Sequence, residues 1–353
     1  MEVHKGSNLI PGVPFALASA VLFGATPPIA KLLLGSVDPV LMAGLLYLGA
    51  GFGLSAFIVA RRLTSVASSE APLTRADVPW LAAAIAIGGV VGPLFLVFGL
   101  ARTEASSASL LLNLESLATM AIAWVVFHEN VDRRLLLGAA AILAGAVLLS
   151  WQGQGVALDL GAVLVAGACL AWGIDNNLTR KVAAADPLVI VAWKGLVAGA
   201  ANTSIAFAQG AGAPEASVAF ACGALGFFGI GVSLVFFVLA LRHLGAARTG
   251  AYYSLAPFIG AVLAILILAE PLTVRLVVAA ILMGIGLWFH LAERHEHLHD
   301  HRALEHEHSH VHDEHHQHAH DGPVTEPHSH RHRHAPMRHR HVHYPDLHHQ
   351  HRH

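Results

Sequence analysis

The sequence predicts an all-α polytopic membrane protein of ten transmembrane helices, followed by a disordered His-rich C-terminal tail. Residues 1–291 are roughly 63% apolar, against ~45–50% in globular proteins. The same residues contain only 14 Lys/Arg and 13 Asp/Glu. A water-soluble fold of this size could not cover its surface with so few charges, which excludes an ordinary soluble enzyme. Residues 292–353, in contrast, hold 23 of the 27 histidines and few apolar residues.

Continuous apolar runs define the predicted helices, because a bilayer core needs about 20 such residues per helix. The ten runs lie near residues 14–34, 40–60, 80–100, 106–127, 135–151, 160–179, 187–207, 218–241, 249–268 and 274–291. The first run is one of many, so we interpret it as a retained span and not as a cleaved signal peptide.

Loop charges predict the orientation, because cytoplasmic loops are enriched in Lys and Arg. Placing both termini in the cytoplasm leaves only Arg102 and Arg275 outside. The cations then inside are Lys5, Arg61, Arg62, Arg75, Arg133, Arg134, Arg180, Lys181, Arg242 and Arg248. We therefore expect an integral protein of the bacterial inner membrane with both termini cytoplasmic. Neither part of the chain shows the clustered basic excess of a nucleic-acid binder.

The first half of the body recurs in the second. Phe23-Gly24 followed by Asp38-Pro39 matches Trp172-Gly173 followed by Asp186-Pro187, and Glu129 matches Glu270 at a separation of 141. Five spans per copy is an odd number, so the copies should be inverted, as in many secondary transporters. The predicted units are residues 1–151, residues 152–291 and the tail, 292–353.

Four stretches carry a family resemblance: FGATPPIAKLLL (23–34), GLARTEASSASLLLNLESLATMAIAWVVFHE (99–129), WGIDNNLTRK (172–181) and YYSLAPFIGAVLAILILAEPL (252–272). They resemble EamA-type transporters of the drug/metabolite transporter superfamily over residues 12–291. The resemblance implies ten helices around a central cavity and the movement of small metabolites, often outward and often coupled to protons. One departure is Glu115-Ser116, where the family often has proline and the second repeat has Ala256-Pro257. A softer kink is therefore expected in the first repeat.

Ionisable residues within spans are costly and face a cavity, a partner or water. Glu115 lies near the predicted midplane. We interpret it as a proton carrier, an anchor for a substrate cation or a structural hydrogen-bond partner. Asp175 and Lys194 lie at similar depth, so an ion pair between them is expected. Consecutive side chains lie 100° apart, so Asp175, Asn176 and Asn177 must include at least one bond to a neighbouring helix. Lys31, near the outer end of its span, is interpreted as snorkelling or lining the cavity.

The tail alternates histidine with other residues and is too polar to form a packed core. Imidazole is a ligand for zinc, nickel, cobalt and copper, so the tail is predicted to bind such metals. The candidate ligands are His295, His297, His299, His301, His306, His308, His310, His312, His328, His330, His332, His334, His339, His341 and His343. Two H-E-x-x-H matches arise from the alternation of histidine itself and do not predict a protease.

These observations favour a secondary transporter, not an enzyme, that moves a small polar metabolite by alternating access and needs no cofactor for transport. The alternatives are an exporter of nickel, cobalt, zinc or a metal–metabolite complex, and a membrane-anchored metal-storage protein. The expected partners are the lipid bilayer, a small-molecule or ion substrate and a proton as coupling ion. A monomer and a homodimer both remain open.

Overall fold

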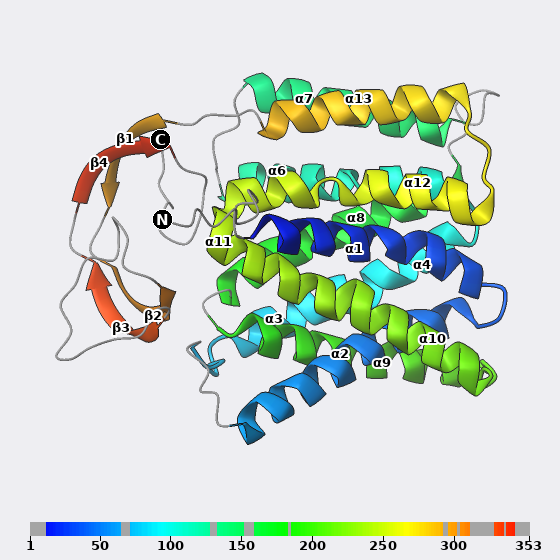
Figure 1. Ribbon diagram of the computed structural model, residues 1–353, viewed down its shortest axis with the longest axis horizontal. Coiled ribbons are helices and arrows are strands. Elements are labelled where there is room, and N and C mark those ends of the chain that lie inside the picture. The colour runs from blue at the N-terminus through cyan, green and yellow to red at the C-terminus, as the bar shows by residue number, and fades with distance from the viewer. Residues whose placement is uncertain are drawn as a thin grey trace, which may run out of the picture.

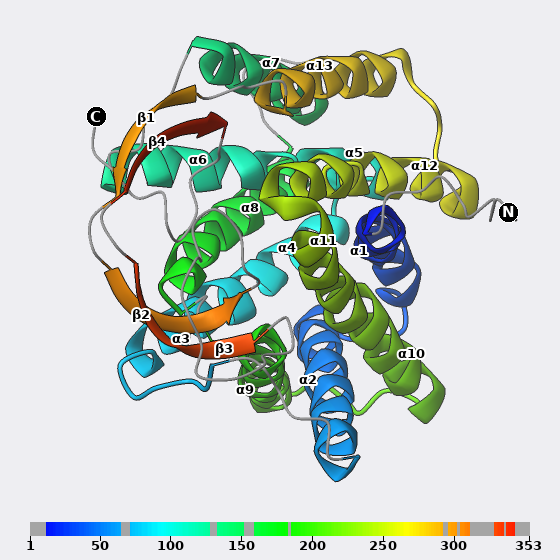
Figure 2. The ribbon, with the colours of Figure 1, turned by 60° about the vertical axis from the view of Figure 1, so that its left-hand side comes forward.

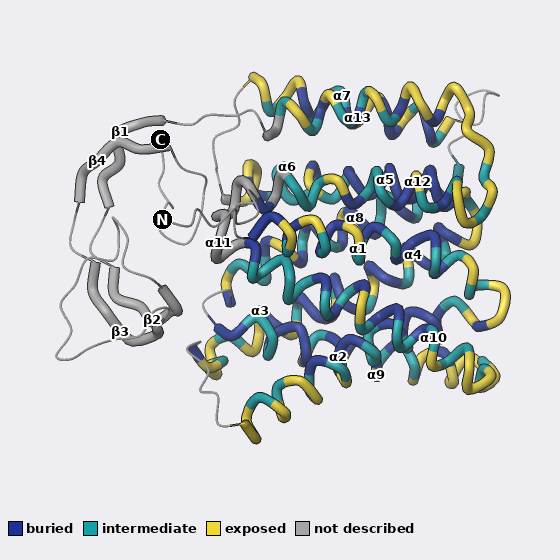
Figure 3. Tube along the Cα trace, in the orientation of Figure 1, coloured by how far each residue is buried: buried dark blue, intermediate teal, exposed yellow. Residues whose placement is uncertain are grey.

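A computed structural model describes residues 12–64, 71–127, 133–151, 159–182 and 185–291, with four tail segments at 296–301, 304–310, 328–334 and 337–342. The side chains of residues 241–248, 250–251 and all residues from 290 onward are not described. Within these limits the body is a bundle of helices that run broadly along one direction (Figure 1). Buried residues gather where helices face one another, and exposed residues lie on outward-facing turns (Figure 3).

The first half of the body consists of α1 (Val13–Leu33), α2 (Pro39–Leu63), α3 (Val78–Ala84), the π-helical η1 (Ile85–Val91), α4 (Gly92–Leu100), α5 (Ala105–Leu111), α6 (Leu114–Phe127) and α7 (Arg133–Ser150). The second half consists of α8 (Leu160–Thr179), the 3₁₀ turn η2 (Arg180–Val182), α9 (Pro187–Ala208), α10 (Ala216–Gly226), the π-helical η3 (Phe227–Val232), α11 (Ser233–Tyr253), α12 (Ala256–Leu268) and α13 (Val274–Leu291).

Among the described residues, seven helical segments are long and apolar enough to cross a membrane. They are residues 13–33, 39–63, 78–100, 105–126, 133–150, 187–208 and 216–240. The predicted spans near 160–179, 249–268 and 274–291 correspond to α8, to the end of α11 with α12, and to α13. Of these, α8 carries the three polar residues 175–177. The chain is thus an integral membrane protein, and the count of ten spans stays a prediction.

The repeated Asp-Pro pairs start equivalent helices in the two halves. The Asp38 Oδ1 atom accepts hydrogen bonds from the backbone N–H groups of Val40 (2.9 Å) and Leu41 (3.1 Å). Asp186 caps α9 in the same way, accepting from the Leu188 N–H group at 2.9 Å. The proline after each aspartate occupies the first turn, where no backbone donor is needed. The sequence repeat is therefore also a repeat of local structure.

The third helix of each half contains a π-helical segment at the same place. Residues 85–91 and 227–232 both adopt this wider turn, and they correspond at the separation of 141 that relates Glu129 to Glu270. Inserted π turns are rare and occur often at functional sites. Because no proline or polar residue marks residues 85–91, the sequence alone does not predict this feature.

The first repeat has a helix break where a softer kink is expected, and the degree of bending stays a prediction. The helix is interrupted at residues 112–113, between α5 and α6, just as it is at 254–255 between α11 and α12. The Asn113 side chain donates to the Leu110 carbonyl at 2.8 Å, and the Ser116 hydroxyl donates to the Asn113 carbonyl at 2.8 Å. These side chains satisfy carbonyls at the break, so it does not need a proline.

The two halves exchange contacts reciprocally. Helix α8, the first of the second half, packs against α4 and α6 of the first half, while α1 packs against α11 and α12 of the second. Equivalent helices also pair with each other, as α2 with α9 and α7 with α13. Figures 1 and 2 both show α7 and α13 side by side at one edge of the bundle. This is the packing expected of two related halves.

Arg61 and Asp186 form an ion pair, with 3.0 Å between Nη2 and Oδ2, where the end of α2 meets the start of α9. The Asp186 N–H group donates to the Ala71 carbonyl at 3.0 Å in the same region. Loops that the charge pattern assigns to the cytoplasm therefore do lie together. Which side of the membrane this end faces stays a prediction.

Four tail segments form strands, which departs from the expected disorder. Strands β1 (Glu296–His301) and β4 (Met337–Val342) pair antiparallel, as do β2 (Leu304–His310) and β3 (His328–His334) (Figure 1). The physical reason is the strict alternation of histidine with other residues, which has the period of a β-strand. The predicted ligands His295, His312 and His343 lie outside the described residues.

Candidate functional site

A buried ion pair between α8 and α9 forms one part of a polar cluster inside the bundle. The Lys194 Nζ atom lies 2.7 Å from both carboxylate oxygens of Asp175. Thr179, one turn along α8, donates to the Asp175 Oδ1 atom at 2.9 Å and accepts from Lys194 at 3.3 Å. Asp175 is buried and Lys194 is partly buried. The pair expected from their similar depth is thus present, and its role in transport stays a prediction.

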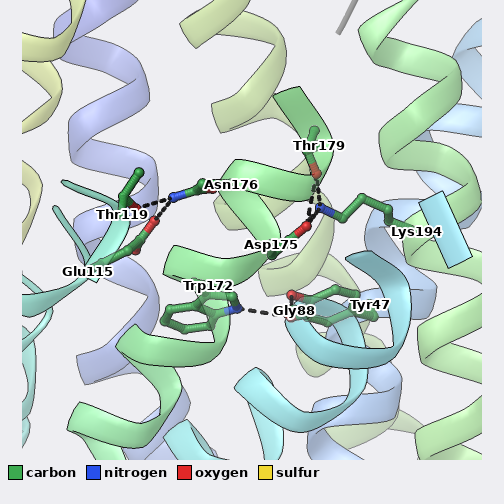
Figure 4. Close-up of polar contacts among 9 residues, drawn as sticks. All are labelled: Tyr47, Gly88, Glu115, Thr119, Trp172, Asp175, Asn176, Thr179 and Lys194. Carbon is green, nitrogen blue, oxygen red and sulfur yellow. Dashed lines mark hydrogen bonds and ion pairs between the residues drawn. The ribbon is translucent and has the colours of Figure 1, made fainter. Parts of the chain in front are cut away.

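Glu115 forms the second part of the cluster, with the neighbouring residue of α8. The Asn176 Nδ2 atom donates to the Glu115 Oε1 atom at 3.0 Å and to the Thr119 Oγ1 atom at 3.1 Å. Glu115 is half-buried and Asn176 is exposed, although Asp175 and Asn177 on either side are buried. Figure 4 shows the two parts of the cluster side by side, joined through α8. This second part is accessible from outside the packed core.

The three consecutive polar residues of α8 contact different partners, as their 100° spacing requires. Asp175 binds α9 and Asn176 binds α6 through side chains. Asn177 donates to the Thr119 carbonyl of α6 at 3.1 Å and to the Gly173 carbonyl of its own helix at 2.8 Å. Asn177 therefore joins two helices, and the first two residues form the cluster.

The π segment η1 is held against this cluster by side chains from three helices. The Gly88 carbonyl accepts hydrogen bonds from the Trp172 Nε1 atom (3.0 Å) and the Tyr47 hydroxyl (3.2 Å) (Figure 4). Asn202 donates to the Gly89 carbonyl at 3.3 Å. These bonds tie α8, α2 and α9 to the part of the third helix where the hydrogen-bonding pattern changes. The candidate site thus adjoins a backbone irregularity.

Lys31 lies away from the cluster, at the opposite end of the bundle from the Arg61–Asp186 pair. Its ammonium donates to the backbone carbonyls of Leu100 and Thr103, where α4 ends. A cation there is favourable because the carbonyls at a helix C-terminus carry partial negative charge. These contacts are those of a cap on the end of α4, and the snorkelling and cavity-lining interpretations of Lys31 stay predictions.

At this same end of the bundle, Glu270 caps the start of α5. Its carboxylate accepts from the N–H groups of Ala105 (2.7 Å) and Ser106 (2.8 Å), which joins the second half of the protein to α5 of the first.

We expect Glu270→Ala to lower the free energy of unfolding by about 1–2 kcal/mol, because it leaves two helix N–H groups without this acceptor. Thermal unfolding in detergent measures the change. Glu104→Ala is the control, because the exposed Glu104 side chain makes no capping bond, and equal loss in both variants would contradict this role.

Sequence reasoning found the charged residues of the cluster and Asn176, and missed its two threonines. Thr119 and Thr179 each lie four residues after a charged member, Glu115 and Asp175, and so share its helix face. That spacing is a signal that could have found them. The role of the Gly88 carbonyl could not be predicted from the sequence, because every residue has a backbone carbonyl and the residues next to Gly88 in the chain are apolar.

No group of three or more His, Cys, Asp or Glu side chains is placed to hold a metal ion in the part of the chain whose side chains are described. Most predicted metal ligands of the tail lie on the four strands, where the backbone register is the relevant observation. His297 is opposite His341, and His299 is opposite His339. In the other sheet His306, His308 and His310 are opposite His332, His330 and His328.

The fold and the cluster define a class: an integral membrane protein of two structurally related helical halves, with ionisable residues gathered between their helices. Comparison with known proteins identifies the family. The model of the EamA-like transporter family matches the chain twice, over residues 10–151 and 159–292. The chain therefore belongs to the EamA-like transporter family, and the resemblance of the four quoted stretches is confirmed.

Two curated relatives and a solved structure are similar to this chain. An "Uncharacterized transporter" of Methanothermobacter thermautotrophicus is 29% identical over 289 residues, covering 77% of this chain and 83% of the relative. A "Probable amino-acid metabolite efflux pump" of Salmonella typhimurium is 28% identical over 192 residues, 52% of this chain and 59% of the pump. A crystal structure described only as that of a protein shares the fold, with a TM-score of 0.57, 20% identity, and coverage of 79% of this chain and 95% of that chain.

Proposed function

We propose that this transporter is a secondary active exporter of a small polar metabolite, which binds at the cluster of Glu115, Asn176, Asp175 and Lys194. The carrying observation is this cluster itself, because charged groups inside membrane helices are costly and mark substrate or ion pathways. The reciprocal packing of two related halves supports alternating access, in which one half rocks against the other around a central site. Export is supported by the efflux pump similar to this chain.

Glu115 is the residue of the cluster through which transport is coupled or substrate is held. Asp175 and Lys194 neutralise each other at 2.7 Å, whereas Glu115 is bound through one oxygen by a neutral amide. A carboxylate reachable from outside the core can take up and release a cation, whether a proton or a charged group of the substrate. The cluster therefore combines a fixed ion pair with an adjacent group that is able to exchange its partner.

The test measures solute accumulation in cells that express the full chain, Glu115→Gln or Glu104→Gln. Each strain is supplied with labelled amino acids, amines, organic acids, nucleosides and sugars, and membrane insertion is checked by immunoblot. We expect the full chain and Glu104→Gln to lower the cellular level of at least one solute, and Glu115→Gln not to do so. An inserted, folded full chain that changes the level of no solute would contradict the proposed function.

We infer in addition that the tail binds divalent transition metals and regulates transport. Imidazole suits zinc, nickel, cobalt and copper. The strand register supports this inference, because histidines are opposite histidines at five positions. Adjacent to these positions Asp300, Glu305 and Glu307 are opposite Arg338, Arg333 and Arg331, and opposite charges at paired positions stabilise strand pairing. The same register thus favours strand pairing and pairs histidine with histidine at five positions.

Deleting residues 295–353 should abolish metal binding and leave basal transport. Purified full-length and tail-deleted proteins are dialysed against zinc, nickel, cobalt or copper, and bound metal is measured by mass spectrometry. We expect metal only on the full chain, and metal-dependent transport rates only there. Equal metal content in both proteins would contradict tail binding, and loss of all transport on deletion would contradict a purely regulatory tail.

A further inference from the structure

The hydrogen-bond donors of the cluster are almost fully used within the protein. The Lys194 ammonium has three N–H groups and three acceptor atoms, which are both Asp175 oxygens and the Thr179 hydroxyl. The Asn176 amide donates twice, to Glu115 and Thr119. Asn177, Trp172 and Tyr47 donate to backbone carbonyls. In the described part of the chain, the hydroxyl hydrogen of Thr119 is therefore the main donor left for a ligand.

The free capacity of the cluster consists of acceptors. Glu115 uses its Oε1 atom for Asn176, and no hydrogen bond from the described residues reaches its Oε2 atom. The Asn176 amide donates both of its hydrogens, to Glu115 and Thr119, and its Oδ1 atom is left as an acceptor. Glu115 is half-buried and Asn176 exposed, so these two oxygens belong to the accessible part of the cluster. A ligand here must supply donors.

The charge balance indicates the same ligand chemistry. Lys194 and Asp175 form a neutral pair, so an ionised Glu115 gives the cluster a net negative charge. A substrate carboxylate or phosphate would meet this charge without free N–H donors to bind it. An ammonium group offers three N–H donors and a positive charge, and hydrogen bonds between ionised groups are about twice as strong as neutral ones.

We propose that Glu115 and Asn176 bind the protonated amine of the transported solute, so the substrates are amines or amino compounds. The inference rests on the proposed function and deepens it. It makes Glu115 the residue that selects the substrate class, and it excludes Lys194 as the anchor of a substrate carboxylate.

The test uses proteoliposomes containing the full chain, with equal pH on both sides and empty liposomes as the blank. Counterflow of labelled solute is measured for sets that share one carbon skeleton. One set is threonine, 1-amino-2-propanol and 3-hydroxybutyrate, and another is leucine, 3-methylbutylamine and 4-methylpentanoate; uridine and glucose represent uncharged solutes. We expect counterflow of amine-bearing members and not of the deaminated acids. Glu115→Gln should lower it on the order of 100-fold, because the charge pair with the amine is lost.

The remaining outcomes separate this inference from the proposed function. Counterflow of only acids or uncharged solutes would overturn the amine assignment and leave the transporter intact. Amine counterflow that survives in Glu115→Gln would also overturn it, since exchange at equal pH needs no proton carrier. No counterflow of any solute would overturn the proposed function and the inference together. Glu104→Gln makes the same chemical change on an exposed loop and should match the full chain.

Discussion

Lys194→Met is expected to lower the free energy of unfolding by about 3–5 kcal/mol, because it leaves the buried Asp175 carboxylate without its cation. Asp175 would keep only the hydrogen bond from Thr179. Thermal and denaturant unfolding in detergent, followed by tryptophan fluorescence, measure the change. Arg62→Met is the control, because it removes a cation from the exposed end of α2.

The double variant Asp175→Asn, Lys194→Met tests the cause of this loss. With no buried charge left, most of the lost stability should return, because a neutral amide costs less to bury than an unpaired carboxylate. If the double variant is as unstable as Lys194→Met alone, side-chain packing and not charge pairing explains the loss. Transport should remain impaired in both variants. The ion pair holds Asp175, and Asp175 is adjacent in the chain to Asn176, which contacts Glu115.

The ionisable part of the site could be predicted from sequence because charges are conspicuous in apolar runs. Asp175 and Lys194 meet because they lie at similar depth in consecutive helices, which counting residues from the helix ends reveals. The contact of Glu115 with Asn176 could not be predicted, since it depends on how α6 packs against α8. The same holds for η1, because hydrogen bonds alone distinguish a π turn from the surrounding helix.

The repeat relation shows that the charges occupy only one of two equivalent places. The Phe23-Gly24 match to Trp172-Gly173 makes Thr26 the counterpart of Asp175. The Asp38-Pro39 match makes Leu46 the counterpart of Lys194, and the separation of 141 makes Ala256 that of Glu115. The described fold is related between halves, but its polar cluster is not. Within the residues whose side chains are described, the transporter therefore has one such cluster, formed by α6, α8 and α9.

Gly88→Ala is expected to lower transport on the order of 100-fold and the free energy of unfolding by about 1–3 kcal/mol. A Cβ atom at Gly88 would overlap the Asp175 carboxylate. That carboxylate cannot move aside without losing its bonds to Lys194 and Thr179. Counterflow in proteoliposomes and thermal unfolding measure the two effects. Gly223→Ala is the control, because its Cβ atom would meet nothing within 4 Å.

Gly229→Ala separates the packing effect from the effect on the site. Gly229 corresponds to Gly88 at the separation of 141, and its Cβ atom would overlap the hydroxyl of Thr26, the counterpart of Asp175. We expect Gly229→Ala to lose stability, to recover it when combined with Thr26→Ala, and to lose less transport than Gly88→Ala at equal stability. Equal loss of transport would mean that the close approach of the third helix, and not the position of Asp175, limits transport. If the substrate is bound beside Asp175, Gly88→Ala loses more transport than Gly229→Ala. The reason is that Gly88 faces the charged Asp175, whereas Gly229 faces the neutral Thr26.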